Sequence, residues 1–267
     1  MMVQKFGSFR FALAFAGLVA GLLSPAAVAQ SSIPGCKELP DHAKLRSVLQ
    51  SVVKEGQKAN SGMGNQEWAA VVNRDGIVCT IVFSGNDRGD QWPGSRPIAA
   101  EKANTANALS GKDFALSTAN DYYPSLPGQS LWSLTVSAPP NPNAVFGNPT
   151  NFGQPNDSMV GKAIGGVIVF AGGLALYDSS GKIVGGLGLS GDTSCADHVM
   201  AWKVRHKLNL DAVPMGVSPD QNDQMIMDIK PDGSSPSGFG HPECKGGLPS
   251  APIIQKLSKE YPTRPHK

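Results

Sequence analysis

Two strand-like runs joined by a tight turn constrain the fold of this chain more than any other feature. Residues 67–73 and 77–84 are rich in Val and Ile, and Arg74-Asp75-Gly76 lies between them. Apolar runs on either side of a short Gly-containing turn predict a β-hairpin. Because a hairpin pairs its strands antiparallel, the sheet cannot be wholly parallel.

Three segments have the composition and periodicity of helices. In residues 41–58, with Asp41 as N-cap, the spacing i, i+3, i+4 gives one apolar stripe of Leu45, Val48, Leu49, Val52 and Val53. Residues 97–109 begin with a proline that is tolerated at a helix start, and Ser95 is the expected cap. Residues 193–208 form the third segment, with three candidate caps: Asp192, Thr193 and Ser194.

The second half adds strands. Residues 166–170, 174–178 and 182–189 are strand-like, and Ser179-Ser180-Gly181 turns the last two into another hairpin. Helices packed on an antiparallel sheet give an α+β fold, which we expect as a two-layer domain over residues 30–211.

Two long segments lack regular patterns. Residues 122–157 are rich in Pro, Asn and Gly, so we expect a surface loop or lid with strand character only at 131–136. Residues 212–267 show no sustained period, and they are predicted to be an irregular C-terminal extension.

The first 29 residues predict export. Lys5 and Arg10 precede an apolar run over 11–23, and Ala27-Val28-Ala29 fits a signal-peptidase site before Gln30. The run is short for a membrane anchor. Cleavage removes two of the 23 Lys and Arg, which leaves them equal in number to the 21 Asp and Glu. This balance gives no reason to expect nucleic acid or a membrane surface as partner.

Four cysteines remain in the mature chain, at spacings that match no zinc site. An even number in an exported protein favours two disulfides among Cys36, Cys79, Cys195 and Cys244. Three pairings are open. Cys36–Cys79 with Cys195–Cys244 closes the shortest loops and is preferred.

Residues 186–191 read Gly-Leu-Gly-Leu-Ser-Gly, a literal G-x-G-x-x-G with Asp211 some way beyond. A dinucleotide site needs a parallel strand after the following helix. Here Pro214 and Pro219 follow instead, and the preceding strand belongs to a hairpin. We therefore interpret the glycines as allowing a helix and a strand to approach closely.

The helix at 193–208 has two faces. One, predicted to pack on the sheet, holds Ala196, Met200, Ala201, Val204 and Leu208. The other holds Cys195, Val199 and Trp202, flanked by His198 and His206. This half-apolar face must be covered by the C-terminal extension, by a cofactor or by a neighbouring subunit.

His198 is the main candidate ligand, because a neutral imidazole binds haem iron or a transition metal. Its alternative is a structural role. Asp197 points to the buried side, where a carboxylate usually holds backbone N–H groups. Lys102 and Arg96 are candidate anchors for a propionate or another carboxylate, or else solvated cations. Tyr122-Tyr123 and Trp132 are candidate pocket walls. No catalytic set stands out.

Several blocks together resemble the GlcG/HbpS family, also called the DUF336 or haem-degrading domain. They are residues 67–76, 97–106, 172–178 and 181–191, with Asp197 after them. The resemblance covers about residues 40–208. It departs from the family at Cys195-Ala196-Asp197, in the long loop and in the extension.

The resemblance implies a profilin-like antiparallel sheet flanked by helices, a homo-oligomer, and haem as ligand. The leading hypothesis is thus an exported periplasmic or secreted protein that binds, stores or senses a tetrapyrrole. Its candidate residues are His198 as axial ligand, with Trp202, His206, Lys102 and Arg96. Two alternatives stay open: a module for another small organic ligand, and a lyase or isomerase using Asp197 and His198 as acid and base.

Overall fold

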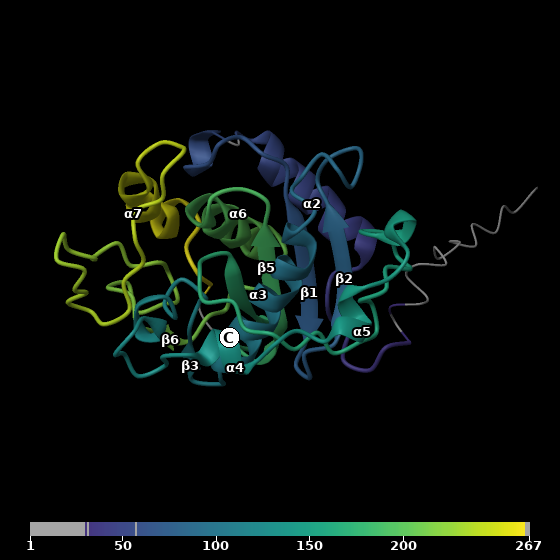
Figure 1. The fold of residues 1–267 in the computed structure, drawn as a ribbon, viewed down its shortest axis with the longest axis horizontal. Coiled ribbons are helices and arrows are strands. Elements are labelled where there is room, and N and C mark those ends of the chain that lie inside the picture. The colour runs from purple at the N-terminus through teal and green to yellow at the C-terminus, as the bar shows by residue number, and fades with distance from the viewer. Residues whose placement is uncertain (1–29, 31, 57, 265–267) are drawn as a thin grey trace, which may run out of the picture.

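The computed structural model describes residues 30, 32–56 and 58–264, so the predicted signal peptide lies outside the described residues (Figure 1). The longer helices are α2 (His42–Lys54), α3 (Ser95–Leu109), α6 (Ser194–Lys207) and α7 (Ser250–Glu260). The main strands are β1 (Trp68–Asn73), β2 (Val78–Phe83), β4 (Gly173–Tyr177) and β5 (Ile183–Ser190). In the described part of the chain, no helix has the length and apolarity needed to cross a membrane.

The central sheet has the strand order β2-β1-β5-β4, and each neighbouring pair is antiparallel. Both predicted hairpins, β1–β2 and β4–β5, are confirmed. In the first turn the Asn73 side chain accepts from the backbone N–H groups of Asp75 and Ile77, and Gly76 has a φ of +73°. The turn is thus built by an Asn side chain and a glycine in the left-handed region.

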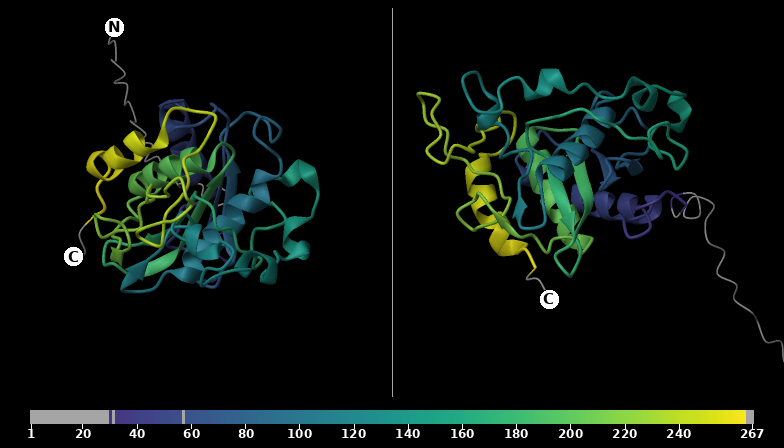
Figure 2. Two further views of the ribbon diagram at one scale, coloured as in Figure 1. Left: turned by 60° about the vertical axis from the view of Figure 1, so that its left-hand side comes forward. Right: turned by 90° about the horizontal axis from the view of Figure 1, so that it is seen from below.

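The sheet is covered on both faces, so the domain has three layers and the two-layer expectation was wrong. Alternate residues of β1 belong to separate apolar clusters: Ala69 and Val71 pack with α2 and α6, and Trp68 and Ala70 pack with α3. Because side chains alternate across a strand, burial of every β1 residue requires helices on both faces (Figure 2). The α+β class with an antiparallel sheet flanked by helices is confirmed.

The glycines of the G-x-G-x-x-G sequence lie where α3 crosses β5. A Cβ on Gly188 would stand 2.0 Å from the carbonyl oxygen of Ala99, and one on Gly186 would stand 2.1 Å from that of Ala103. These positions therefore admit only hydrogen. The packing interpretation is confirmed, and the partner helix is the preceding α3.

The helix starts and ends differ in detail from the prediction. Asp41 caps α2 by accepting from Lys44 N, but the helix ends at Lys54 and is followed by Gly56 with a φ of +132°. Ser95 is the first residue of α3 and does not cap it. Thr193 caps α6 by accepting from Ala196 N. Asp192 instead accepts from N–H groups of the segment Met63, Gly64 and Asn65.

Two predicted strand segments are not strands. Residues 166–170 are irregular, because Gly165 and Gly166 have φ values of +62° and +71° and Ile168 N donates to the side chain of Thr105. Residues 131–136 also form no strand; the short helix α4 (Leu134–Ser137) begins within them.

The loop over residues 122–157 crosses the surface, as predicted, with short helical turns including α5 (Pro142–Val145) and a 3-10 turn at Pro149–Asn151. Its end is fixed at Asp157, which accepts from Arg96 and from the N–H groups of Gly153 and Met159. Because both carboxylate oxygens are bonded to buried groups, this end of the loop is held rigidly against α3.

The extension contains more structure than the sequence indicated. Helix α7 lies within it, and a short parallel pair joins β3 (Phe114–Ala115) to β6 (Met215–Gly216). Cys244 bonds Cys195, and Arg205 of α6 holds Asp223 through two bonds of 2.6 and 2.8 Å. The extension is therefore stapled onto α6. The second disulfide joins Cys36 to Cys79, so the preferred pairing is confirmed.

Candidate functional site

The outer face of α6, predicted to meet a ligand, is sealed by the C-terminal extension. The His198 side chain is fully buried, and its Nε2 accepts from the backbone N–H of Met225 at 3.3 Å. Burial lowers the pKa of His198 to about 3, so the ring is neutral, and acceptance at Nε2 places its proton on Nδ1. Nδ1 is buried and finds no partner among the described residues.

Trp202 closes the same face. Its indole N–H donates to the carbonyl oxygen of Tyr261 at 2.8 Å, and only 2% of the residue is exposed. Ile254 and Leu257 of α7 belong to the same apolar cluster. Of the three predicted covers for this face, the structure provides the extension. Neither His198 nor Trp202 is accessible to haem, so His198 does not fit as its axial ligand.

His206 also has a partner within the chain. Its Nδ1 lies 2.7 Å from Asp211 Oδ2, and its ring meets Tyr261 edge-on at 5.5 Å between centroids. Arg264 holds the other oxygen of Asp211. The three groups join the end of α6 to the end of the described chain.

The two predicted anion anchors are both neutralised inside the protein. Lys102 Nζ lies 2.6 Å from Asp197 Oδ2, with both side chains buried. Arg96 pairs with Asp157 and lies 3.7 Å from the centre of the Phe152 ring. The prediction of an anchor or a solvated cation was wrong for both residues, because each is paired with a buried carboxylate from a residue far away in the sequence.

The structure does not bring Asp197 and His198 into one acid–base site. Asp197 points toward α3 and Lys102, and His198 points toward Met225 in the extension. Two adjacent helical residues project about 100° apart, which explains why they serve different layers.

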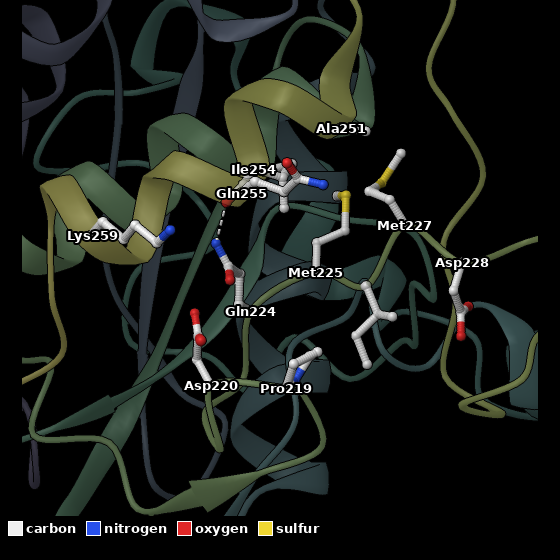
Figure 3. A pocket seen from close by; sticks show the side chains of 11 residues that line it. Pro219, Asp220, Gln224, Met225, Met227, Asp228, Ala251, Ile254, Gln255 and Lys259 are labelled. Atoms are coloured by element: carbon white, nitrogen blue, oxygen red, sulfur yellow. Dashed lines mark hydrogen bonds between the residues drawn. The ribbon is translucent and has the colours of Figure 1, made fainter.

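A groove of about 390 Å³ lies on the outer side of the extension (Figure 3). We call it the methionine groove; it is lined by Pro219, Asp220, Gln224, Met225, Ile226, Met227, Asp228, Ala251, Ile254, Gln255 and Lys259. In Figure 3 both thioethers lie at one end, and Lys259 and Asp220 lie at the other. The groove thus has the thioether of half-buried Met227, beside buried Met225, at one end and the exposed Lys259 at the other.

The wall that carries the methionines is held by polar contacts on both sides. Asn120 donates to the carbonyl oxygen of Gln224, and the Gln224 side chain donates to that of Ile254 in α7. His198 accepts from Met225 N directly beneath. These three contacts orient a segment that has no regular secondary structure. The alternation Met225-Ile226-Met227 was the sequence signal for this wall, and sequence analysis missed it.

A second, smaller cavity of about 250 Å³ lies between the loop and β1. We call it the tryptophan hollow; it is lined by Trp68, Asp87, Arg88, Gly89, Pro93, Pro149 and Phe152. The Trp68 indole N–H donates to Trp92 O, which fixes its ring. Trp132, a predicted pocket wall, is 57% exposed and lines neither cavity. Tyr122 and Tyr123 line neither cavity either.

Three buried acids were not singled out from the sequence. Burial raises the pKa of Asp121 and that of Glu101, each to about 7, and raises the pKa of Glu67 well above its usual value. Neither oxygen of Asp121 has a hydrogen-bond partner among the described residues. No periodicity marks such positions, because their burial depends on segments that are distant in sequence.

Comparison with known proteins fits the fold described above, an α+β domain with an antiparallel sheet between helices. A family model described as haem degrading protein HbpS-like matches residues 41–205. The match covers more than half of the chain, so this protein belongs to the HbpS-like family, and the resemblance seen in the sequence is confirmed. The methionine groove lies outside the matched residues.

Two solved structures are similar at low identity. Klebsiella pneumoniae protein ORFY, of the DUF336 family, is 21% identical over 61% of this chain and 86% of that chain, with a TM-score of 0.41. The PduOC:heme complex is 20% identical over 63% of this chain and 94% of that chain, with a TM-score of 0.42. The comparison with curated proteins gave no match.

Proposed function

We propose that this protein is an exported haem-binding protein that takes haem in the methionine groove and acts in binding, storage or sensing. The observation that carries the proposal is the thioether of Met227, which is half-buried and lines an open groove beside the buried Met225, in a chain from a haem-associated family. Thioether sulfur is an axial ligand of haem iron in proteins. The residues of the groove therefore fit the group chemically, whereas those of the α6 face do not.

Each wall of the groove has a distinct part. Met227 would ligate the iron, and the edges of Met225, Ile226 and Ile254 that line the groove would contact the apolar macrocycle. Lys259 would pair with a propionate. A volume of about 390 Å³ lies within the range of cofactor sites, about 300–1,000 Å³. Bound haem supplies an iron centre that changes oxidation state and binds small ligands.

Haemin titration followed by absorption spectroscopy tests this function. The wild-type protein is expected to shift the Soret band. The double variant Met225→Leu/Met227→Leu keeps the size of the side chains but removes both sulfurs, and it is expected to bind at least about tenfold more weakly, a loss of about 1.4 kcal/mol. Met215→Leu, at an exposed methionine outside the groove, is the matched control. If wild-type protein leaves the Soret spectrum of haemin unchanged, the haem assignment is wrong. If the double variant binds haemin with unchanged affinity, the methionine groove is not the binding site.

Two observations support export. The leader over residues 1–29 has the pattern of a signal peptide, and the described cysteines all form disulfides, which persist in oxidising compartments. Cell fractionation followed by N-terminal sequencing should find the chain outside the cytoplasm and starting at Gln30. Homo-oligomerisation stays a prediction, to be measured by light scattering.

A second candidate function is binding of a small apolar molecule in the tryptophan hollow. The observation that favours it is the aromatic and proline lining, with Trp68, Phe152 and Pro93 around one cavity. A ligand there would stabilise the folded protein without a Soret band. Thermal shift with small uncharged aromatic compounds, compared between wild type and Phe152→Ala, separates this function from haem binding.

A further inference from the structure

Three side chains from three elements meet in the interior beside the end of β5. Lys102 comes from α3, Asp197 from α6, and Glu67 from the residue before β1. All three residues are at most 1% exposed to solvent. We call them the buried lysine–carboxyl cluster. Nζ of Lys102 lies 2.6 Å from Oδ2 of Asp197.

Backbone and one aromatic ring enclose this cluster. The Lys102 Nζ also donates to the carbonyl oxygen of Leu189 at 3.0 Å, and the Phe170 ring centre lies 4.7 Å from it. A Cβ on Gly172 would stand 2.8 Å from that nitrogen and 2.9 Å from Cβ of Asp197. Amine and carboxyl are therefore held in direct contact and away from bulk water.

Glu67 makes this more than an ion pair. No donor group among the described residues reaches either carboxyl oxygen of Glu67, and its side-chain hydrogen-bond partner is the neighbouring carboxyl of Asp197. Burial, followed by the charge of Asp197, raises the pKa of Glu67, so its carboxyl carries a proton that it can donate to Asp197. The lysine thus faces one carboxylate, with a second carboxyl beside it that can give and take a proton.

We propose that Lys102 and Asp197 condense to an intramolecular amide, with Glu67 as the proton relay. The ammonium of Lys102 gives up a proton, and the neutral amine attacks Cγ of Asp197. The new C–N bond forms as the Cγ–Oδ2 bond breaks. Glu67 carries protons from the nitrogen to Oδ2, which leaves as water. An ammonium and a carboxylate become one amide and one water, so atoms and charge balance without any co-reactant.

The surroundings match the product as well as the reactants. The amide keeps one N–H, for which the carbonyl oxygen of Leu189 is the acceptor already in place. Oδ1 becomes the amide oxygen, and it already accepts from the backbone N–H of Asp192 at 3.1 Å. The reaction also removes two buried charges, which are costly to keep in a protein interior. The bond would join α3 to α6 across the sheet.

Mass spectrometry of the full exported chain tests the amide. After reduction of the disulfides and denaturation, the folded wild-type protein should be lighter than its mature sequence by one water molecule. A proteolytic digest should contain a branched peptide joining the segment around Lys102 to that around Asp197. A wild-type protein with the full sequence mass and two separate peptides would overturn the proposal.

The variants assign the roles. Lys102→Arg should restore the full mass. Glu67→Gln should leave most molecules unlinked, and Glu101→Gln, at a buried acid on the same helix α3 outside the cluster, should stay fully linked. Asp197→Asn can lose ammonia instead of water, so it should reach the wild-type mass. A Glu67→Gln protein that is folded by circular dichroism and fully linked would contradict the relay. The proposal is independent of haem binding.

Discussion

The backbone N–H of Met225 donates to Nε2 of His198 at 3.3 Å, and this one bond joins the methionine groove to the helix beneath it. The bond requires a neutral imidazole, because a protonated ring has no acceptor. The histidine that the sequence indicated as a ligand therefore supports the segment that carries the proposed ligand, Met227.

Acid should weaken the protein through this histidine. The pKa of His198 is lowered from 6.5 to about 3 in the folded state, so below pH 6.5 the unfolded chain binds a proton that the folded chain does not. Each pH unit below that point costs up to about 1.4 kcal/mol of stability until the folded pKa is reached. Above about pH 6.5 the histidine contributes no pH dependence to the free energy of unfolding. His198→Gln, which can keep an acceptor for Met225, should lose less stability between about pH 6.5 and pH 4 in urea unfolding. An identical acid slope in both proteins would contradict this role.

Removal of the Cys195–Cys244 disulfide should loosen the extension. The double variant Cys195→Ser/Cys244→Ser is expected to lose about 2–4 kcal/mol of unfolding free energy. It should also expose Trp202, seen as a red shift of its fluorescence. Cys36→Ser/Cys79→Ser is the matched control. The disulfide that it removes closes a loop of similar length, 43 against 49 residues, and does not involve the extension. Equal fluorescence changes in the two proteins would rule out the stapling role.

Gly188→Ala should destabilise the protein through backbone overlap with α3. The added Cβ would stand 2.0 Å from Ala99 O, and relieving such an overlap costs about 1–3 kcal/mol or more. Gly111→Ala is the control, because a Cβ there meets nothing within 4 Å. Thermal unfolding of both variants gives the comparison. A Gly188→Ala protein as stable as Gly111→Ala would show that the helix can shift without cost.

Asp121→Asn should stabilise the protein in alkaline solution. Burial raises the folded pKa of Asp121 from 3.8 to about 7, so the folded chain holds more protons between these values. The carboxyl therefore costs stability as the pH rises through this window, and the full cost is present above pH 7. The variant removes the charge and should gain on the order of 4 kcal/mol at about pH 8, with little gain near pH 4. A gain of the same size at both pH values would exclude ionisation as its cause.

Local patterns were enough to predict much of the framework. The turn at Arg74-Asp75-Gly76 and the apolar stripe of α2 each depend on neighbours in sequence, and both are present in the structure. Helix α7 was missed although Ile253, Ile254 and Leu257 recur at helical spacing, because the helix is short and lies within a Pro- and Gly-rich segment. Its buried residues, Ile254 and Leu257, pack in the same apolar cluster as α6.

The site was harder to predict, because each candidate residue has a partner far away in the chain. Arg96 is neutralised by Asp157, and His198 accepts from Met225. Such pairings depend on how the loop and the extension return to the domain. No spacing within one segment carries that information.

By itself, the sequence determined the antiparallel hairpins, three of the amphipathic helices and the family, since period, turn residues and composition act over short stretches of chain. The tertiary structure alone decided which faces of the sheet and of α6 are covered and which charged side chains are paired inside the protein. Burial is a property of the assembled layers: it buried His198 under the extension, joined Lys102 to Asp197 beside Glu67, and left two methionines lining an open groove.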